Sequence, residues 1–333
     1  MKSGNLAFFV PHLGCPYHCS FCDQTCITGN RRMVSADEVI RTAREQAQGP
    51  ENRAAHTEIA FFGGSFTLIP RPVMTELLAA GAYCVQNLGY KGIRLSTRPD
   101  GISPEIIKTL LSFGVTAVEL GAQSMEDEVL RKNGRGHTAQ DVVDAAGQIR
   151  SAGIELGLQM MTGLPGDTAE GALKTADKLL RLSPATVRIY PTIVLPGTLL
   201  ADWYRQGAYT PQSLEEAVSL CARLIPHFEE NGCRVIRVGL HDETGVRDHH
   251  LAGPYHPAFG ELCRSRIYRN RMEKLLFSFY PAGSYTVFVS CQDLSIALGQ
   301  KKENLAYWKD FHYNLHVVPD TALPRGEFRI CSI

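Results

Sequence analysis

The chain has 333 residues, of which 44% are hydrophobic and 20% are charged, with 34 basic and 34 acidic side chains. This length supports one or two domains with a sizeable core. A formal net charge of zero gives no global electrostatic case for a nucleic-acid or membrane partner, although a local basic patch stays open. We find no signal segment and no apolar run of about 18 residues, so we expect a cytoplasmic protein without a membrane partner.

Short apolar runs bounded by glycine, proline or polar turns predict the strands. They cover residues 6–10, 58–62, 92–96, 117–120, 155–160, 186–190 and 234–238. Amphipathic stretches between them predict helices over residues 35–48, 71–88, 103–112, 138–151, 168–182 and 213–231. Ser35 with Glu38, and Ser213 with Glu216, have the spacing of a capping box at two of these helix starts.

Repeated strand–helix units of this kind imply a parallel sheet wrapped by helices. The number of units is too small for a complete eightfold barrel. We therefore expect an α/β fold in which residues 1–240 form a partial (β/α)6-7 barrel with its chemistry at the carboxyl ends of the strands.

Residues 241–333 predict a small C-terminal α+β domain. It has a helix rich in basic residues, a strand over 286–289, a helix near 300–311 and strands over 315–318 and 328–330. The basic side chains of the first helix are Arg264, Arg266, Arg269, Arg271 and Lys274. They could bind phosphates, but such helix faces are usually only solvated. The turn Gly299-Gln300-Lys301-Lys302 resembles the Gly-x-x-Gly loop of KH RNA-binding modules without its second glycine.

The cysteines near the N-terminus form the most informative motif. Cys15, Cys19 and Cys22 are spaced Cys-x3-Cys-x2-Cys in a loop that follows the first predicted strand. Three thiolates from one loop can hold three corners of a [4Fe–4S] cluster and leave one iron open for a ligand. The alternative is a structural zinc site, which needs a fourth ligand. Candidates for that ligand are His12, His18 and Cys26. Colour would distinguish a cluster site from a zinc site, because an iron–sulfur protein is brown and a zinc protein is colourless.

Glycine-rich and polar strings follow the predicted strands at the points where the strands end. They are Gly63-Gly64-Ser65-Phe66, Thr97-Arg98-Pro99-Asp100, residues 119–124, residues 162–167 and Tyr190-Pro191-Thr192. Glycines let a main chain approach a ligand closely, and exposed amides and hydroxyls bind polar groups. A Gly-Gly pair alone is more often a tight turn. Five such strings at successive strand ends, downstream of a cysteine loop, predict a cofactor site.

The cysteine spacing resembles that of the radical S-adenosylmethionine (SAM) superfamily. This resemblance implies that the open iron chelates SAM, and that an electron from an external flavodoxin-type or ferredoxin-type donor cleaves SAM to methionine and a 5′-deoxyadenosyl radical. The strand-end strings, together with Arg135-Gly136-His137-Thr138, resemble the radical SAM domain of the Elongator catalytic subunit over about residues 6–240. That family separates its first two cluster cysteines more widely. It also carries an acetyltransferase domain, whose Gly-rich acetyl-CoA turn residues 241–333 lack.

The Elongator-like resemblance implies roles for particular residues. Gly63, Gly64 and Ser65 would lie at the methionyl amine of SAM, and Gln123 and Ser124 near its ribose or carboxylate. The residues that would border the adenine are Met161, Thr162, Gly163 and Leu164. The candidate catalytic residues are Arg98, His137 and Tyr190.

Each candidate catalytic residue also has a structural alternative. Arg98 would pair with the SAM carboxylate or face the substrate, or it would only bridge Glu119. His137 would transfer protons or only begin a helix. Tyr190 would line the substrate chamber or only pack against it, and Asp167 would cap the following helix.

Four hypotheses of function follow from the sequence, and the last is the zinc-stabilised structural protein that the cysteine loop leaves open. The first is a radical SAM enzyme with an unidentified substrate, for which tRNA or another RNA is one candidate. The second is a radical SAM enzyme that acts on a small molecule, as oxygen-independent coproporphyrinogen oxidase does. The third is a non-catalytic RNA-binding or scaffold protein that keeps the barrel, for which eroded cysteines would be expected. The sequence predicts no oligomeric state.

Overall fold

The structure is a computed structural model that describes residues 4–10, 15, 17–23, 32–48, 53–240 and 249–332. Its contacts divide the chain into two compact units. The first comprises Met1–Ser213 and His227–Tyr255, and the second comprises Leu214–Pro226 and His256–Ile333. The boundary near residue 240 expected from the sequence stays a prediction.

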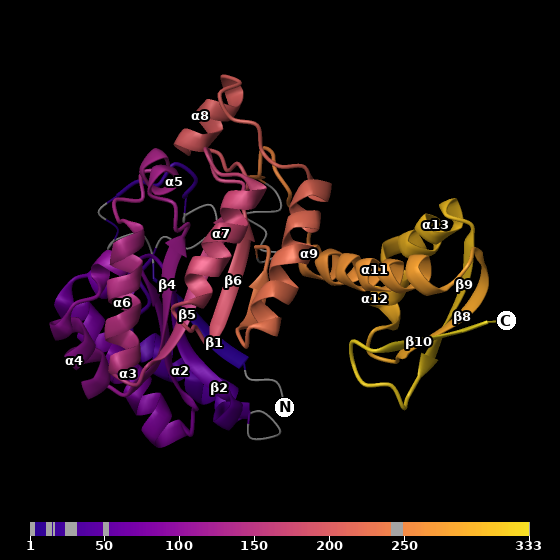
Figure 1. Cartoon of the computed structure of the whole chain (residues 1–333). Coiled ribbons are helices and arrows are strands. Elements are labelled where there is room, and N and C mark those ends of the chain that lie inside the picture. The colour runs from indigo at the N-terminus through magenta and orange to yellow at the C-terminus, as the bar shows by residue number, and fades with distance from the viewer. Residues whose placement is uncertain are drawn as a thin grey trace. The chain divides into compact units, whose positions relative to one another are not determined.

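The first unit is built on a sheet of parallel strands that pair in chain order. The strands are β1 (Gly4–Val10), β2 (Thr57–Gly63), β3 (Gly92–Thr97), β4 (Val115–Gln123), β5 (Glu155–Thr162), β6 (Thr186–Pro191) and β7 (Arg234–Val238). All seven contain the segments expected from the apolar runs. The sheet curls into a half-barrel, so the predicted partial barrel is confirmed (Figure 1).

Helices connect the strands and cover one face of the sheet (Figure 1). They are α2 (Ala36–Ala47), α3 (Arg71–Leu88), α4 (Pro104–Ser112), α6 (Ala139–Ser151), α7 (Ala169–Leu180) and α9 (Leu214–Glu230). All six were expected, and the Ser35 side chain caps α2 by accepting a hydrogen bond from the Glu38 amide. Two short helices were missed, α5 (Asp127–Lys132) and α8 (Leu199–Arg205). Both lie at the end of the barrel where the strands finish (Figure 1).

The core lies between the sheet and these helices. Strand residues in alternate positions are almost fully buried there, among them Ile59, Phe61, Ile93, Leu95, Leu120 and Leu158. Phe61 stacks on Phe66, the residue that follows the Gly-Gly-Ser turn, with 4.9 Å between ring centroids. Burial of this kind stabilises a domain by roughly 1.5–3 kcal/mol for each large apolar side chain. It therefore fixes the register of the strands and the positions of their ends.

The opposite face of the sheet carries buried charges instead of apolar side chains. Arg94 donates to Glu58 at 2.7 Å and to Glu155 at 2.7 Å. Arg188 binds Glu119 with both ends of its guanidinium, at 2.6 and 3.0 Å. Such pairs offset the cost of burying a charge only while every partner is present. We call this set of paired side chains the barrel floor. Its members are Glu58, Arg94, Glu119, Glu155 and Arg188.

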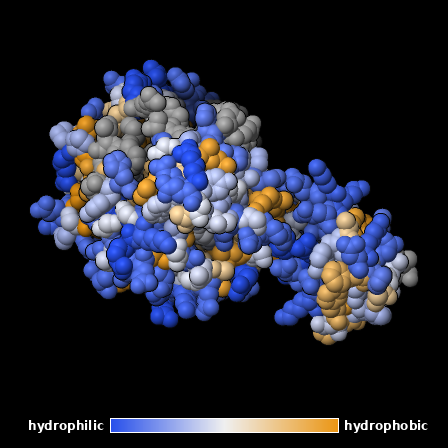
Figure 2. Space-filling view, turned by 90° about the horizontal axis from the view of Figure 1, so that it is seen from above, coloured by the Kyte–Doolittle hydropathy of each residue, from blue (hydrophilic) through white to orange (hydrophobic). Residues whose placement is uncertain are grey.

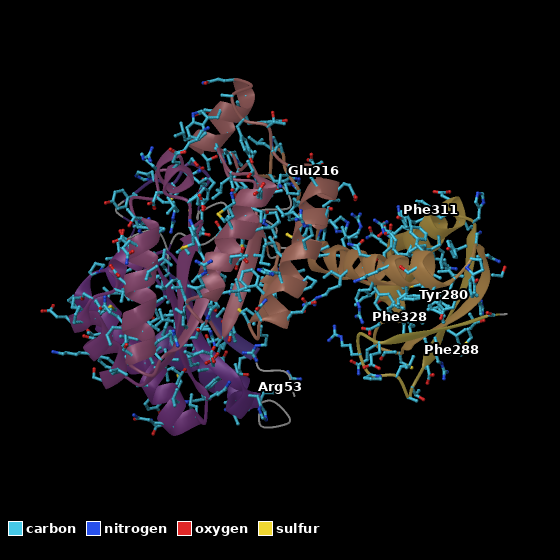
Figure 3. All side chains as sticks on the ribbon, in the orientation of Figure 1. Arg53, Glu216, Tyr280, Phe288, Phe311 and Phe328 are labelled. Carbon is cyan, nitrogen blue, oxygen red and sulfur yellow. The ribbon has the colours of Figure 1, made fainter. Side chains whose placement is uncertain are left out.

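The second unit packs α11 (Phe259–Phe279), α12 (Leu294–Leu298) and α13 (Glu303–Asp310) with a separate sheet. That sheet has the order β10 (Phe328–Ser332), β8 (Gly283–Ser290), β9 (Tyr313–Asp320). Its core is rich in aromatic side chains, and Tyr280 and Phe328, which pack against this core, are labelled in Figure 3. Hydrophobic residues gather on one face of this unit (Figure 2), and its exposed apolar side chains include Phe277, Phe279 and Phe311.

The arginines of α11 mostly contact their own unit. Arg266 pairs with Glu215 at 2.6 Å, and Arg269 lies 4.2 Å above the ring of Tyr307. Arg271 donates to the carbonyl oxygen of Gly326 at 2.5 Å. Arg271 and Lys274 are exposed, whereas Arg264, Arg266 and Arg269 are half-buried, so the five side chains do not form one uniformly solvated face.

The backbone of the turn between α12 and α13 is left-handed at the fourth position of the string that resembles the KH Gly-x-x-Gly loop. Lys302 occupies this position in place of the second glycine and has a φ angle of 63°. In the part of the chain that the structure describes, no helix has the length and apolar composition needed to span a bilayer.

Candidate functional site

The cysteine loop lies beside the carboxyl ends of the barrel strands. Cys19 is 6% exposed, and the Cys22 amide donates to the Cys19 carbonyl at 3.1 Å. Burial, reinforced by Cys19 and Cys15 and opposed by Arg135, raises the pKa of the Cys22 thiol to about 12. A bound metal would reverse this shift, because a coordinating thiol is deprotonated outright. Cys26 lies outside the described residues.

The three thiols do not converge on one point. Among the described residues, no group of three His, Cys, Asp or Glu side chains could hold a single metal ion. A mononuclear zinc ion needs all its sulfur ligands at about 2.3 Å. In a cubane cluster each thiolate binds a different iron, so convergence on one point is not required.

Asn133 joins the cysteine loop to the segment after β4. Its carbonyl accepts a hydrogen bond from the Ser20 amide at 3.0 Å, and its side chain accepts one from the Ser20 hydroxyl at 2.7 Å. The Asn133 amide group also donates to the carbonyl of Pro165 at 3.0 Å. Asn133 is fully buried. One side chain thus ties the loop to the turns that follow both β4 and β5.

Among the described residues, Arg135 and Ser65 each contact a thiol of the loop. The Arg135 guanidinium donates to the sulfur of Cys19 at 3.3 Å. The Ser65 hydroxyl, which follows β2, donates to the sulfur of Cys15 at 3.8 Å. The string that contains Arg135 was noted in the sequence, but neither Arg135 nor Asn133 was expected in the site. The glycines on either side of Arg135 were the available signal.

Arg98 follows β3 and has three contacts in the site. It forms a bidentate pair with Asp100 at 2.8 and 3.0 Å, donates to the carbonyl of Arg135, and stacks 4.8 Å from the ring centroid of Tyr17. Arg98 thus bridges a neighbouring acidic residue, as the structural alternative expected, but the partner is Asp100 and not Glu119, which pairs with Arg188 and Arg94. The Nη1 atom of Arg98 is buried and has no partner among the described residues.

His137 is 5% exposed and lies directly before Thr138, which caps α6. Its Nε2 atom is 3.3 Å from the carbonyl oxygen of Ala122, and its buried Nδ1 atom has no described partner. Burial, together with the positive charges of Arg135 and Arg98, lowers the pKa of His137 to about 4. The ring is therefore neutral at pH 7. Because a proton-transfer residue works best with a pKa near the working pH, this shift does not favour that role, which stays a prediction.

The Gly-Gly-Ser turn after β2 packs against β1. Gly63 has a φ angle of 112°, and a Cβ atom there would collide with the carbonyl of Val10. The Gly64 amide donates to the same carbonyl at 2.8 Å. Gly63 is thus needed for the approach of two strands, whatever the turn binds. The Gly64 amide is already used by Val10, so the carbonyl groups of the turn are the backbone groups suited to accept the SAM amine that the sequence assigned to it.

Gln123 ends β4 at a break in the strand register. Its φ angle of 64° is rare for a residue other than glycine, and its Oε1 atom is buried without a described partner. Ser124 differs, since its hydroxyl accepts from the Glu126 amide at 3.2 Å and lies 3.4 Å from the hydroxyl of Thr175. Gln123 has an unmet acceptor and Ser124 does not, so only Gln123 has a side-chain atom available for a ligand.

The adenine-bordering segment begins on β5. Met161 is half-buried and lies two residues after Gln159, which donates to Glu119 on the inner face of the sheet. The carbonyl of Thr162 accepts from the Thr192 amide at 2.9 Å, and that of Gly163 accepts from the Tyr209 hydroxyl at 2.7 Å. Leu164 is 2% exposed. The main chain of this turn is thus held by hydrogen bonds from two other segments of the chain.

Two further expectations concern side chains near the substrate chamber. Tyr190, on β6, forms a hydrogen bond with Arg188, and burial raises the pKa of its hydroxyl. It therefore lies on the inner face of the half-barrel. The cap of α7 is Thr168, whose hydroxyl accepts from the Gly171 amide at 2.9 Å, and not Asp167 as expected. Asp167 instead accepts from the Thr168 amide at 2.8 Å.

Unpartnered buried polar atoms collect at this end of the barrel. They are Arg98 Nη1, Gln123 Oε1, Arg135 Nε and His137 Nδ1. A buried polar atom without a hydrogen bond costs about 1–3 kcal/mol, so native structures rarely keep several together. Donors and an acceptor beside three thiols suit a polar, charged cofactor. The residues present therefore fit an iron–sulfur cluster and the aminoacyl end of SAM.

Two family models match the chain. The model described as the radical SAM superfamily covers residues 9–179, and the model described as the radical SAM C-terminal domain covers residues 184–269. The chain belongs to the radical SAM superfamily. Enzymes of this superfamily use a [4Fe–4S] cluster and SAM, so the expected cofactors and enzyme class are confirmed. Which residues bind them stays a prediction.

Curated relatives and solved structures extend the comparison. The chain is 36% identical to the tRNA uridine(34) acetyltransferase of Dehalococcoides mccartyi over 230 residues, which is 62% of this chain and 50% of that protein. It is 25% identical to the heme chaperone HemW of Lactococcus lactis over 252 residues, 75% of this chain and 65% of that protein. The structure of Methanocaldococcus infernus Elp3 matches with a TM-score of 0.64 at 22% identity, over 82% of this chain and 64% of that chain. This chain thus spans half or less of the tRNA-modifying relatives that it matches.

Proposed function

We propose that this radical SAM enzyme generates a 5′-deoxyadenosyl radical at Cys15, Cys19 and Cys22 and uses it to modify a nucleotide of an RNA, with tRNA as the first candidate. One observation carries the proposal. Arg135 and Ser65, which follow β4 and β2, each contact a cysteine of the loop. These contacts support the proposal, because Ser65 belongs to a strand-end turn that the sequence assigned to SAM and Arg135 follows another strand of the same sheet.

When bound, the cluster and SAM supply the radical, and the residues of the chain orient them. The carbonyls of the Gly63–Gly64 turn are suited to accept the SAM amine, and the unpartnered Nη1 of Arg98 to donate to its carboxylate. The buried Oε1 of Gln123 is an acceptor for a ribose hydroxyl. Each of these groups belongs to a turn fixed by the sheet, so little ordering would be needed on binding.

The inner face of the half-barrel offers a surface for the substrate. Phe62, Gln159, Met161 and Tyr190 are half-buried, and the guanidinium of Arg188 lies 4.9 Å from the centroid of the Phe62 ring. Aromatic and amide side chains of this kind stack on and hydrogen-bond to unstacked bases. This supports a nucleotide as the substrate, and the named activity of the Dehalococcoides relative supports tRNA.

The test is anaerobic turnover with chemically distinct substrates. Reconstituted enzyme, SAM and a one-electron donor are incubated with total tRNA, with a porphyrinogen or with buffer, and 5′-deoxyadenosine is quantified by mass spectrometry. We expect tRNA to raise its yield at least tenfold over buffer. Stimulation by the porphyrinogen alone would shift the assignment to a small molecule, and no 5′-deoxyadenosine under any condition would refute radical generation.

Cysteine variants test the site itself. Cys15→Ala, Cys19→Ala and Cys22→Ala should each abolish the cluster absorbance and its iron. Cys84→Ala is the control for Cys19→Ala, because Cys84 is also buried but lies on α3, within the helix layer. Equal iron content in the Cys19 and Cys84 variants would refute the ligand assignment.

A further inference from the structure

Arg135 is a buried cation that faces a thiol. The side chains of both partners are shielded from solvent, with 6% of Arg135 and 6% of Cys19 exposed, and Nη1 is 3.3 Å from the sulfur. No carboxylate within the described ranges forms an ion pair with Arg135. An unpaired buried charge is strongly unfavourable. An anionic neighbour is therefore required, and thiolate sulfur is the group that the structure places there.

The neighbouring basic groups, Arg98 and His137, are not buried charges without a partner of opposite charge. The charge of Arg98 is balanced by Asp100 through two hydrogen bonds at 2.8 and 3.0 Å. His137 is neutral near pH 7 because burial and the two arginines lower its pKa to about 4. Arg135 is thus the uncompensated positive charge among the described residues around Cys19.

The guanidinium of Arg135 is held in one orientation by the fold. Nη2 donates to the carbonyl of Gly121 at 2.5 Å, which leaves Nη1 directed at the sulfur. The Arg135 amide donates to the carbonyl of Leu130 at 3.0 Å. On either side, Gly134 and Gly136 have φ angles of 65° and 68° and bring the main chain against the cysteine loop. A planar fork with two fixed acceptors has little freedom to turn away.

We propose that Arg135 tunes the reduction potential of the cluster by donating a charge-assisted hydrogen bond to the Cys19 thiolate. Reduction adds one electron, taken from the external one-electron donor, and breaks or forms no bond. A fixed positive charge and a hydrogen bond to a ligand sulfur favour the more negative, reduced state. Arg135 is a positioning residue in this role, and the inference rests on the cluster assigned above.

The experiment compares neutral and charged replacements of Arg135. Arg135→Gln and Arg135→Met remove the charge, whereas Arg135→Lys keeps it without the planar fork. Midpoint potentials are measured by redox titration of the reconstituted proteins without SAM, followed by electron paramagnetic resonance. We expect the neutral variants to have at least a tenfold lower ratio of reduced to oxidised cluster at a fixed potential, which is about 59 mV for one electron. The lysine variant should lie between them and wild type.

Other outcomes are also decisive. Cluster loss from both neutral variants, with retention in Arg135→Lys and unchanged melting of the apoproteins, supports the same electrostatic role. Unchanged potentials in the neutral variants, or cluster loss from Arg135→Lys as well, would overturn it in favour of a packing role. A wild-type protein that binds no cluster would instead refute the proposed function, so the two failures are distinguishable.

Discussion

Replacing Gly136 by alanine should loosen the cysteine loop from the barrel. A Cβ atom at position 136 would lie 2.5 to 2.7 Å from three carbon atoms of the Tyr17 ring, well inside normal contact. Tyr17 lies between Cys15 and Cys19 in the sequence, and its ring stacks on Arg98. The Tyr17 ring must therefore move away from position 136 and from Arg98, and the cysteine loop loses this contact with the barrel.

The magnitude follows from a matched pair of glycines. Gly114 has a φ angle of 71°, close to the 68° of Gly136, but a Cβ atom at position 114 would meet nothing within 4 Å. Both alanine variants lose roughly 1–2 kcal/mol from the left-handed backbone. Only Gly136→Ala also loses the contact between Tyr17 and Arg98, about 0.5–1 kcal/mol at an exposed site. We expect it to be about 1 kcal/mol less stable than Gly114→Ala.

Urea denaturation of the apoproteins measures the difference in the free energy of unfolding between Gly136→Ala and Gly114→Ala. Iron release to a chelator measures the effect of each substitution on the cluster. An extra 1 kcal/mol at the loop corresponds to about fivefold weaker retention of iron. In a Tyr17→Ala background the clash disappears, so Gly136→Ala should then cost no more than Gly114→Ala. Equal iron release from the two single variants would refute the proposed docking of the loop.

Three more predictions concern buried polar groups. Glu119→Gln should lower the free energy of unfolding by about 3–5 kcal/mol in urea titrations, because it leaves the Arg188 guanidinium without its bidentate partner. For His137, the folded-state pKa of about 4 lies below the ordinary value of 6.5. The unfolded chain therefore binds the proton more tightly, and stability should fall by about 3 kcal/mol as the pH drops from 6.5 to 4. Asn304→Ala should lower the melting temperature and cost about 1–3 kcal/mol, because Asn304 donates to Ser265 and to two carbonyls at the end of α12.

Each of these predictions has a control. Arg205→Ala breaks an exposed pair with Asp202 and should change stability by less than 1 kcal/mol. A Glu119 variant no less stable than this control would contradict the network argument. His137→Gln should flatten the acid-induced loss of stability, and an unchanged pH profile would mean that other groups cause it. Wild-type stability in the Asn304 variant would mean that water replaces its three hydrogen bonds.

Most of the barrel could be predicted because its signal is local. Apolar runs and glycine or proline turns mark each strand, and the strand ends came within a few residues of those in the structure. α5 and α8 were missed because helices this short carry too few turns to show a 3.6-residue period. Arg98 and Asp100 are two residues apart in the sequence, so their pair was predictable, whereas the bridge to Glu119 required knowing that Glu119 points to the barrel floor.

The support of the cysteine loop was less predictable because it comes from residues far away in the sequence. Asn133 bonds to Ser20 across 113 positions, and Arg135 reaches Cys19 across 116. Neither contact follows from periodicity or turn chemistry. Glycine flanks on both sides of an arginine were the one local indication, since left-handed glycines allow a close approach of two main chains. The sequence thus predicted the chemistry of the site but not the residues that hold the cysteine loop against the barrel.

The distribution of buried charge links the fold to its chemistry. The barrel floor has acidic residues that outnumber the two arginines they bind, Arg94 and Arg188. At the other end Arg135 has no carboxylate partner among the described residues, and Arg98 needs only Asp100. The Arg135 charge is therefore placed beside the thiols, where it opposes the burial that raises the pKa of Cys22. A positive charge at this point favours a reduced cluster and the carboxylate of SAM, which are negative charges that this chemistry brings together.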